Sequence, residues 1–260
     1  MELQLLKKEF FAEYCTRLSK EGILHQFESL LDSELSTSIF SFHTSVSAVY
    51  SSKTEGEAIE LESYFTHRLL QSGKIPEAII RTDDLYRAYL YAHKHPLNID
   101  NLMVTHAMIC RHILPPQLRG RIRNSNMIIN MNDDKWSYVA VSKDKVLKEL
   151  EKLFLDINEL MKADLDILEV FYYASFIHLI FVKIHPMADG NGRLARLLEK
   201  WFISSKLGHA KTWFVQSERY YFGNFSLYMT SLDLGSDYDK TEYKLALPFL
   251  WMLPESLKLS

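Results

Sequence analysis

The sequence predicts an all-α fold that contains one β-hairpin. Nine glycines and seven prolines in 260 residues are about half of the share that globular chains usually carry, roughly 12%. So few chain breakers favour long helices over many short strands. Apolar residues recur at helical spacing over most of the chain. Only residues 127–141 read as two short strands around a polar turn.

The individual elements follow from this periodicity and from the breakers between the segments. The first amphipathic segment spans residues 2–20, and Gly22 is expected to stop it. Pro96 ends one later helix, and Pro115 with Pro116 ends the next. The pattern predicts helices over residues 2–20, 26–53, 57–71, 77–95, 99–114, 143–162, 166–184, 193–206 and 220–232.

Two of the predicted elements have a particular place in the fold. Residues 166–184 are apolar nearly all round, which predicts a central helix. The hairpin is expected to have strands at 127–131 and 136–141, joined by a turn at 132–135. A lone hairpin is only marginally stable, so it is expected to lie against helices.

Composition excludes several classes of protein. With 47% apolar residues, 24% charged residues and a net charge of −3, the chain does not bind nucleic acid by bulk positive charge. Cys15 and Cys110 are too few for a disulfide scaffold and badly spaced for a zinc site. The apolar run 171–182 is far short of a membrane span of ~20 residues, and the charged start does not resemble a signal peptide. We therefore expect a cytoplasmic protein with no membrane partner.

Residues 185–196, which read His-Pro-Met-Ala-Asp-Gly-Asn-Gly-Arg-Leu-Ala-Arg, carry the chemistry. Gly190 and Gly192 allow a tight turn that exposes successive backbone N–H groups. These groups lie where a helix is expected to begin, and unpaired donors at a helix N-terminus favour an anion. Arg193 and Arg196 are three residues apart, so both can reach that anion from one helix face.

Two further side chains of this segment fit a polyphosphate site. Asp189 offers a hard oxygen ligand suited to Mg²⁺ that bridges phosphates. His185 is the one side chain here that exchanges a proton near neutral pH. Together they predict a site that activates a hydroxyl nucleophile beside a bound polyphosphate. A plain helix–loop–helix corner would explain any one of these residues, but not the whole set.

The segment also resembles the signature of the Fic family (filamentation induced by cyclic AMP), with Met187 where the family usually has Phe. The resemblance implies transfer of AMP from ATP to a Ser, Thr or Tyr hydroxyl of a protein target. His185 would be the general base, and Asp189 would hold Mg²⁺ against the phosphates. Met187 is expected to anchor the loop in the core.

The same resemblance assigns the anion-binding positions. Arg193 and Arg196 would bind the β- and γ-phosphates, whereas phosphate oxygens would be taken by Asn191 and by the amides of Gly190 and Gly192. Gly192 favours AMP transfer, because the phosphorylating Doc-type branch resembles this motif but has Lys at that position.

Other segments resemble further parts of the family. Gly120 to Arg123 followed by a hairpin looks like the entry to its flap. There the backbone of Met127, Ile128, Ile129 and Asn130 would align the target peptide by strand addition and border the nucleotide. Tyr220 with Tyr221 resembles the aromatic pair near the adenine pocket, although aromatic packing explains it equally well. His178 is interpreted as a core histidine.

A built-in inhibitor is the second hypothesis from resemblance. Ser51, Glu55 and Gly56 match the spacing of the family's inhibitory helix, in the branch that carries it N-terminal to the signature. Glu55 would pair with Arg196 and so remove the partner of the γ-phosphate. The alternative is an ordinary helix C-terminus with Gly56 at the cap.

The resulting organisation has three parts. Residues 1–40 form a helical extension, residues 41–235 the catalytic domain and residues 236–260 a tail packed on it. The inhibitory helix is placed at about 41–56, the flap at about 127–141 and the active-site loop at 185–196. A bifunctional enzyme that also removes AMP, and an inactive interaction module, remain alternatives to the adenylyltransferase. The extension leaves a homodimer or a docking surface open.

Overall fold

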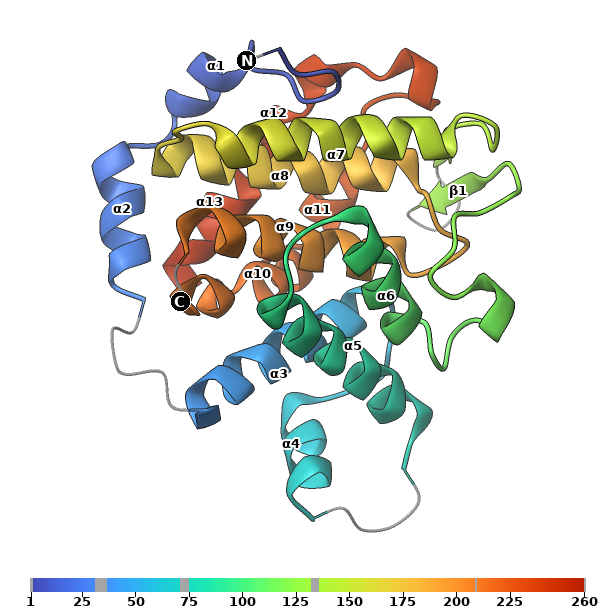
Figure 1. The fold of residues 1–260 in the computed structure, drawn as a ribbon. Coiled ribbons are helices and arrows are strands. Elements are labelled where there is room, and N and C mark those ends of the chain that lie inside the picture. The colour runs from blue at the N-terminus through green and yellow to red at the C-terminus, as the bar shows by residue number, and fades with distance from the viewer. Residues whose placement is uncertain (1, 31–36, 71–74, 132–135, 209, 260) are drawn as a thin grey trace.

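The computed structural model describes residues 2–30, 37–70, 75–131, 136–208 and 210–259. It confirms the all-α fold with one hairpin. Helix α8 (Ile167–Ile184) runs through the middle, with α7 (Val146–Lys162) along one side and α9 (Asn191–Leu207) along another (Figure 1). Because nearly every side chain of α8 is buried, its sequence is apolar all round, as expected for a central helix.

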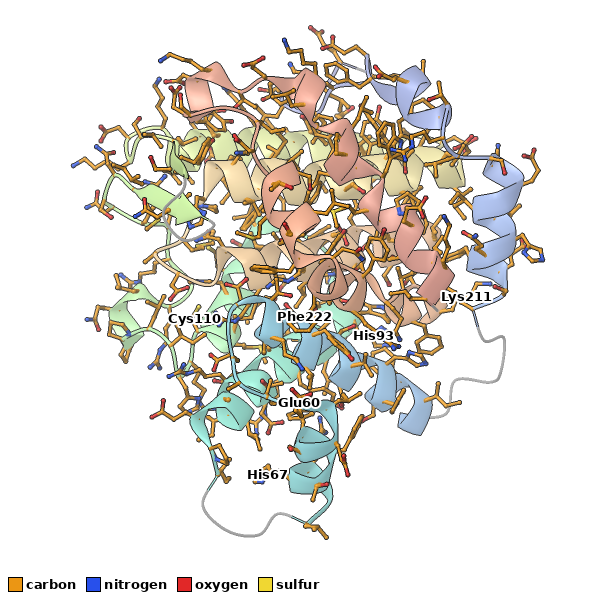
Figure 2. The ribbon with its side chains drawn as sticks, turned by 180° about the vertical axis from the view of Figure 1, so that it is seen from behind. Glu60, His67, His93, Cys110, Lys211 and Phe222 are labelled. Carbon is orange, nitrogen blue, oxygen red and sulfur yellow. The ribbon has the colours of Figure 1, made fainter. Side chains whose placement is uncertain are left out.

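A second group of helices packs against α9 and lies below it in the view of Figure 1. This group also borders the loop that follows α8. The group consists of α3 (Thr37–Thr54), α5 (Glu77–Lys94) and α6 (Ile99–Ile109), with the shorter α4 (Leu61–Leu70) at its edge. Helix α10 (Ser217–Gly223) lies along α3, where Phe222 approaches the ring of Tyr50 (Figure 2).

The C-terminal part of the chain returns to the central helix. After α11 (Phe225–Ser231), the short helices α12 (Leu247–Leu250) and α13 (Met252–Ser256) pack on α8. Short 3₁₀ turns complete the described chain at Pro116–Leu118, Ala210–Phe214, Tyr238–Lys240, Tyr243–Leu245 and Leu257–Leu259. Residues from both ends of the chain therefore share one hydrophobic core with α8.

Helix α8 is also the one helix in the described ranges whose length and composition would suit a membrane span. Within this protein, 89% of that stretch is buried by the surrounding helices. Its apolar surface is thus used as the core.

The hairpin pairs β1 (Ile128–Met131) with β2 (Trp136–Val139) in antiparallel register. Ala140 donates its N–H to the carbonyl of Met127 at 3.1 Å, and Val139 donates on the other side to Ser236 at 2.9 Å. Alternate residues of an antiparallel strand point their backbone groups to opposite sides. Ile128 and Asn130 therefore direct their N–H and C=O groups away from β2. The expected turn at 132–135 lies outside the described residues.

The predicted helix over residues 2–20 is wrong. The chain forms α1 (Phe11–Cys15) and a separate α2 (Lys20–Glu28), because the backbone N–H groups of residues 4–6 are bound by the carboxylate of Asp156 instead of by helical carbonyls. Gly22 does not stop a helix but lies in the first turn of α2. Its N–H donates to the side chain of Ser19, which caps that helix.

Four other boundaries differ from the sequence-based expectation. The helix expected at 57–71 begins only at Leu61. The helix expected at 26–53 is divided between the end of α2 and α3, and residues 31–36 between them lie outside the described part of the chain. The helix expected at 99–114 ends at Ile109, five residues before the two prolines. The helix expected at 220–232 is divided at Asn224, so α10 and α11 are separate helices.

Candidate functional site

The predicted general base, His185, ends the central helix in a left-handed backbone conformation with φ of 51°. Residues other than glycine rarely adopt this conformation, and strained residues of this kind cluster at functional sites. Nδ1 lies 3.3 Å from the carbonyl oxygen of Val182. Because a carbonyl only accepts, Nδ1 carries the proton, and Nε2 remains the unprotonated nitrogen. His185 thus has the tautomer that a general base at Nε2 requires.

Arg123 holds this turn from the side of the flap. Its Nε donates to the carbonyl of His185 at 2.7 Å, and its backbone N–H donates to the carbonyl of Pro186 at 2.9 Å. Its guanidinium also donates to the carbonyls of Ser125 and Val141 at the two sides of the hairpin. One buried arginine therefore fixes His185 and the hairpin relative to each other.

The turn at Asp189 and Gly190 rests on α6. His106 accepts the N–H of Gly120 on Nδ1 at 2.8 Å, so its Nε2 carries the proton and donates to the carbonyl of Asp189 at 3.0 Å. Gly190 has φ of 77°, and a Cβ there would lie 2.6 Å from the sulfur of Cys110, at the end of α6 (Figure 2). Only glycine suits both the backbone angle and the close approach. His106 and Cys110 were not identified as site residues from the sequence, since neither belongs to the motif.

The side chain of Asn191 has a role within the loop. Its Nδ2 donates to the carbonyl of Met187 at 3.0 Å, and its Oδ1 accepts the N–H of Met187 at 2.9 Å. Both polar atoms are thus used inside the loop, and only the backbone amide of Asn191 remains at the start of α9 for an anion. Met187 is fully buried and pairs with Ile122, as expected for the residue that anchors the loop.

Four hydrogen bonds hold Arg196 in this structure. Its guanidinium donates to the hydroxyl of Tyr228 at 3.2 Å, to the side chain and the carbonyl of Ser51, and to Oε1 of Glu55 at 2.6 Å. Burial alone would raise the pKa of the Glu55 carboxyl, but Arg196 and Arg193 lower the pKa below its usual range. Glu55 is therefore held as a carboxylate against the arginine of the motif.

Gly192 and Gly56 allow this approach of Glu55. A Cβ at Gly192 would lie 2.4 Å from Oε1 of Glu55, so the absence of a side chain there makes room for the carboxylate. Gly56 follows the end of α3 with φ of 86°, as is common after a helix. Ser51, Glu55 and Gly56 therefore belong to one helix end that contacts Arg196. The interpretation as an ordinary helix C-terminus accounts for the backbone at Gly56 but not for the contact with Arg196.

A second carboxylate of the same turn, Glu57, was missed by sequence reasoning. It lies 3.6 Å from the guanidinium of Arg193 and accepts a hydrogen bond from Arg81 on α5 at 3.1 Å. Both arginines of the motif are thus paired with glutamates that stand two positions apart. The spacing Glu-Gly-Glu was visible in the sequence, but nothing in it placed Arg193 or Arg81 beside Glu57.

We expect Glu57→Gln to raise the basal reaction of the site about two- to fivefold, because a partly screened ion pair contributes ~0.5–1 kcal/mol to the competition for Arg193. The measurement is incorporation of label from ATP under identical conditions. Glu60→Gln is the matched control, because Glu60 lies at the start of α4 (Figure 2) and pairs with Lys53 at 2.8 Å. Equal rates in all three proteins would show that Glu57 does not compete for Arg193.

These groups surround one cavity of about 190 Å³. His185, Gly192, Arg196 and Glu55 line one part of it, and Ile129, Asn130 and Tyr138 of the hairpin line another. Of the four flap residues predicted to border a nucleotide, Met127 and Ile128 face a different groove, beside Asp237 and Tyr238.

Tyr220 is not brought to the cavity. It lies on α10, where burial and the carboxylate of Glu255 on α13 raise the pKa of its hydroxyl. Tyr228 on α11 lines the cavity instead, since the break at Asn224 gives α11 its own direction. The nucleotide contact of Tyr220 therefore stays a prediction from the sequence.

His178 is a core histidine, as interpreted from the sequence. It is fully buried, with Nδ1 2.8 Å from Glu199 and Nε2 3.1 Å from the hydroxyl of Tyr228. Because that hydroxyl also receives a hydrogen bond from Arg196, His178 supports the arginine of the motif from behind.

Residues 96–203 match the family model described as "Fic/DOC family". The chain contains a Fic/DOC family domain. The matched residues include the Asp189–Gly190 loop, the helix α6 that supports this loop, and the flap. The match confirms the family resemblance that the motif indicated. The Fic domain is thus the part of the chain that carries His185, the Asp189–Gly190 loop and both arginines of the motif.

Relatives and solved structures agree with this assignment. A protein adenylyltransferase fic-1 of Caenorhabditis briggsae is 27% identical over 156 residues, which are 55% of this chain and 28% of that protein. A protein adenylyltransferase Fic of Nematostella vectensis is 31% identical over 103 residues, 39% of this chain and 22% of that protein. The chain therefore spans about a quarter of the length of these curated relatives.

The fold as a whole matches crystallised Fic proteins. A Fic family protein of Desulfovibrio desulfuricans superposes with a TM-score of 0.79 at 16% identity, over 100% of this chain and 76% of that one. Fic-1 (residues 134–508) of Caenorhabditis elegans superposes with a TM-score of 0.67 at 16% identity, over 95% of this chain and 71% of that one.

The Fic domain offers one carboxylate for a magnesium ion. Asp189 is exposed at the loop, and one of its oxygens accepts the N–H of Gly190. Across the described residues, no three His, Cys, Asp or Glu side chains gather into a metal site. Mg²⁺ is usually bound by one or two carboxylates together with substrate phosphates and water, so Asp189 fits an ion that enters with a nucleotide.

Protonation of His185 is expected to depend on folding. Burial lowers the pKa of its imidazole to about 4, whereas an unfolded chain titrates near 6.5. Between these pH values the unfolded state binds more protons, so the free energy of unfolding falls as the pH falls. When the pH is lowered from 6.5 to 4, we expect the free energy of unfolding, measured in urea, to fall by about 2–3 kcal/mol more for wild type than for His185→Asn. Asparagine is chosen because it tolerates the left-handed backbone of residue 185. If the free energies of unfolding of the two proteins changed in parallel with pH, the low pKa of His185 would be contradicted.

Proposed function

We propose that this protein is an autoinhibited protein adenylyltransferase, which transfers AMP from ATP to a Ser, Thr or Tyr hydroxyl of a target protein. One observation carries the proposal most directly. The base, the anion-binding start of α9 and the arginine of the motif line a single cavity, and Glu55 of the same chain occupies that arginine. The names of the relatives support the type of reaction.

In this reaction, the target hydroxyl oxygen bonds to the α-phosphorus of ATP while the bond to the β-phosphate breaks and pyrophosphate leaves. His185 takes the hydroxyl proton at Nε2, because Nδ1 is already committed to the carbonyl of Val182. The low pKa of His185 keeps the imidazole neutral and able to accept that proton near pH 7. Arg123 holds the ring in place through the carbonyl of His185.

The phosphates would be bound by the start of α9. Its first amides, at Asn191 and Gly192, have no acceptor within the helix and are available to bind an anion. Arg193 and Arg196 would neutralise the β- and γ-phosphates. Asp189 would hold Mg²⁺, which supplies charge neutralisation of the phosphates when it is bound.

The target segment would add to the hairpin as a further strand. The outward N–H and C=O groups of Ile128 and Asn130 form the open edge of β1, while the outer edge of β2 is paired with Ser236. Main-chain hydrogen bonds of this kind align an extended peptide without dictating its sequence. Asn130 also lines the cavity, so a strand there would pass beside His185.

Inhibition follows from the occupation of Arg196. A γ-phosphate and the Glu55 carboxylate are both anions that need the same forked donor, so they cannot both bind it. With Glu55 in place, ATP would lack one clamp, and its α-phosphate would not be presented for attack. Glu57 would weaken the second clamp in the same way through Arg193.

Intact mass spectrometry tests the reaction type. Purified Glu55→Gly protein is incubated with Mg²⁺ and ATP, and the expected product carries one AMP unit on the enzyme itself or on an added hydroxyl-bearing substrate. A phosphate-sized increase would instead indicate the phosphorylating branch. AMP removal is tested by incubating AMP-labelled protein with wild type and, separately, with Glu55→Gly. Only wild type retains the Glu55 carboxylate, which could direct a water molecule at the attached AMP.

A further inference from the structure

Helices α3 and α9 meet along a seam of polar side chains. Lys200 of α9 donates from Nζ to the hydroxyl of Ser47 of α3 at 2.7 Å. Four residues along each helix, Arg196 donates from Nε to the hydroxyl of Ser51 at 2.9 Å. All four side chains are buried, with exposed fractions of 4% or less. Because residues four apart share one face of a helix, the two hydrogen bonds are successive contacts between antiparallel helices.

The contact of Glu55 with the motif is the next one along the same seam. Glu55 stands four residues after Ser51, and Gly192 stands four residues before Arg196. The Oε1 atom of Glu55 would lie 2.4 Å from a Cβ at Gly192, and it accepts a hydrogen bond from Arg196 at 2.6 Å. Ser47 is therefore two contacts away from the carboxylate, which is about 12 Å along the helix axis.

The ammonium group of Lys200 is fixed independently of α3. It donates to Oε2 of Glu218 on α10 at 2.7 Å, and Tyr89 on α5 donates its hydroxyl to Oε1 of the same carboxylate at 2.6 Å. Lys200, Glu218 and Tyr89 are all buried. Helices α5, α9 and α10 thus hold a charged donor in one place, and Ser47 is the group through which α3 binds to it.

Hydrogen bonds along this seam fix the register of the two helices. Apolar contacts are non-directional, whereas a hydrogen bond requires a defined distance and angle. A buried polar residue between two helices can for this reason specify their register. At Ser47 and Ser51, α3 offers α9 small hydroxyl side chains rather than large apolar ones, so the position of α3 along α9 depends on these hydrogen bonds.

We propose that Lys200 and Ser47 set the register of α3 on α9 and thereby position Glu55 against Arg196. The proposal rests on the proposed function, because it takes the contact of Glu55 with Arg196 to be inhibitory. Lys200 and Ser47 are positioning residues, since neither of them lines the cavity. Loss of their hydrogen bond weakens the hold on the end of α3, so that Arg196 is released more often and basal transfer of AMP rises.

Ser47→Ala in the full chain tests this role. It removes the hydrogen bond but leaves Lys200 paired with Glu218, whereas a change of Lys200 would leave that carboxylate buried without its cation. We expect Ser47→Ala to raise the initial rate of AMP incorporation about three- to tenfold. The increase is smaller than for Glu55→Gly because the contact at Ser51 remains. In the Glu55→Gly protein, the same change is expected to alter the rate by less than about twofold.

The two backgrounds separate positioning from a merely structural role. A structural defect would change the rate in both, whereas a residue that acts through Glu55 has no effect once Glu55 is absent. Ser52→Ala is the matched control and is expected to leave the rate unchanged. Ser52 also lies on α3 and is 1% exposed, but its hydroxyl has no hydrogen-bond partner among the described residues. A wild-type rate in Ser47→Ala, or an equal increase in both backgrounds, would overturn the proposal.

Amide hydrogen exchange provides a readout that does not depend on AMP transfer. The amides of Glu55 and Gly56 donate to the carbonyls of Ser52 and Lys53 at the end of α3. Ser47→Ala is expected to speed their exchange about threefold or more, and Ser52→Ala to leave it unchanged. If Glu55→Gly transfers no AMP, the proposed function is overturned, whereas faster exchange in Ser47→Ala leaves the register role standing. Unchanged exchange in Ser47→Ala would overturn the register role even where AMP transfer is observed.

Discussion

Glu55→Gly is expected to raise incorporation of AMP from ATP by about 10- to 100-fold over wild type. The Glu55 carboxylate accepts a hydrogen bond from Arg196 at 2.6 Å, and such a charged hydrogen bond contributes ~1.5–3 kcal/mol, which corresponds to this range of rates. When it is removed, the γ-phosphate takes the free guanidinium, and the α-phosphate is presented to the nucleophile. The measurement is the initial rate of label incorporation at saturating Mg²⁺ and ATP.

Two further variants show whether charge or space is responsible. Glu55→Gln keeps the shape but removes the charge, so an increase close to that of Glu55→Gly indicates competition for Arg196. Glu60→Gln removes a carboxylate that is exposed and pairs only with Lys53 among the ion pairs of the described chain, and it should leave the rate unchanged. If Glu55→Gly and wild type incorporate label equally, the contact with Arg196 is structural and inhibits nothing.

His185→Asn, placed in the Glu55→Gly protein, is expected to lower AMP transfer by about 10²- to 10⁴-fold, the usual contribution of a positioned general base. Nucleotide affinity should change less than about threefold, because the phosphate-binding groups are on α9 and not on the imidazole. Asparagine suits the left-handed backbone at this position, so the loop is expected to keep its form.

The measurement combines label incorporation with calorimetric binding of ATP. Retained binding together with lost transfer assigns His185 to the chemical step. Loss of both would instead indicate a disturbed loop, which circular dichroism and thermal unfolding of the variant would reveal. Undiminished transfer would exclude His185 as the base.

The helices of the catalytic core could be predicted because their signals are local. Apolar spacing identified α5, α7, α8 and α9 to within a few residues, and Pro96 marked the end of α5. Local signals failed where a distant group captured the backbone. Residues 4–6 read as helix, but Asp156, some 150 positions away, binds their N–H groups.

The candidate site divides in the same way. The motif predicted that one short segment brings together His185, Asp189, Gly190, Gly192 and both arginines, because these residues are neighbours in sequence. The residues that support this loop come from other parts of the chain. His106 and Arg123 contact the loop only after α6 and the flap have packed against it. The motif also did not show that the side chain of Asn191 closes the loop on Met187.

The sequence by itself therefore determined the helical fold class, the family motif and the chemistry that its residue types allow. These depend on spacing along the chain, which the sequence shows directly. The family resemblance already implied that Glu55 pairs with Arg196. Only the tertiary structure decided other contacts across the chain, such as Glu57 on Arg193 and Lys183 beside Tyr138. Such contacts join residues tens of positions apart, and the packing of whole helices, which no local pattern records, sets their distance.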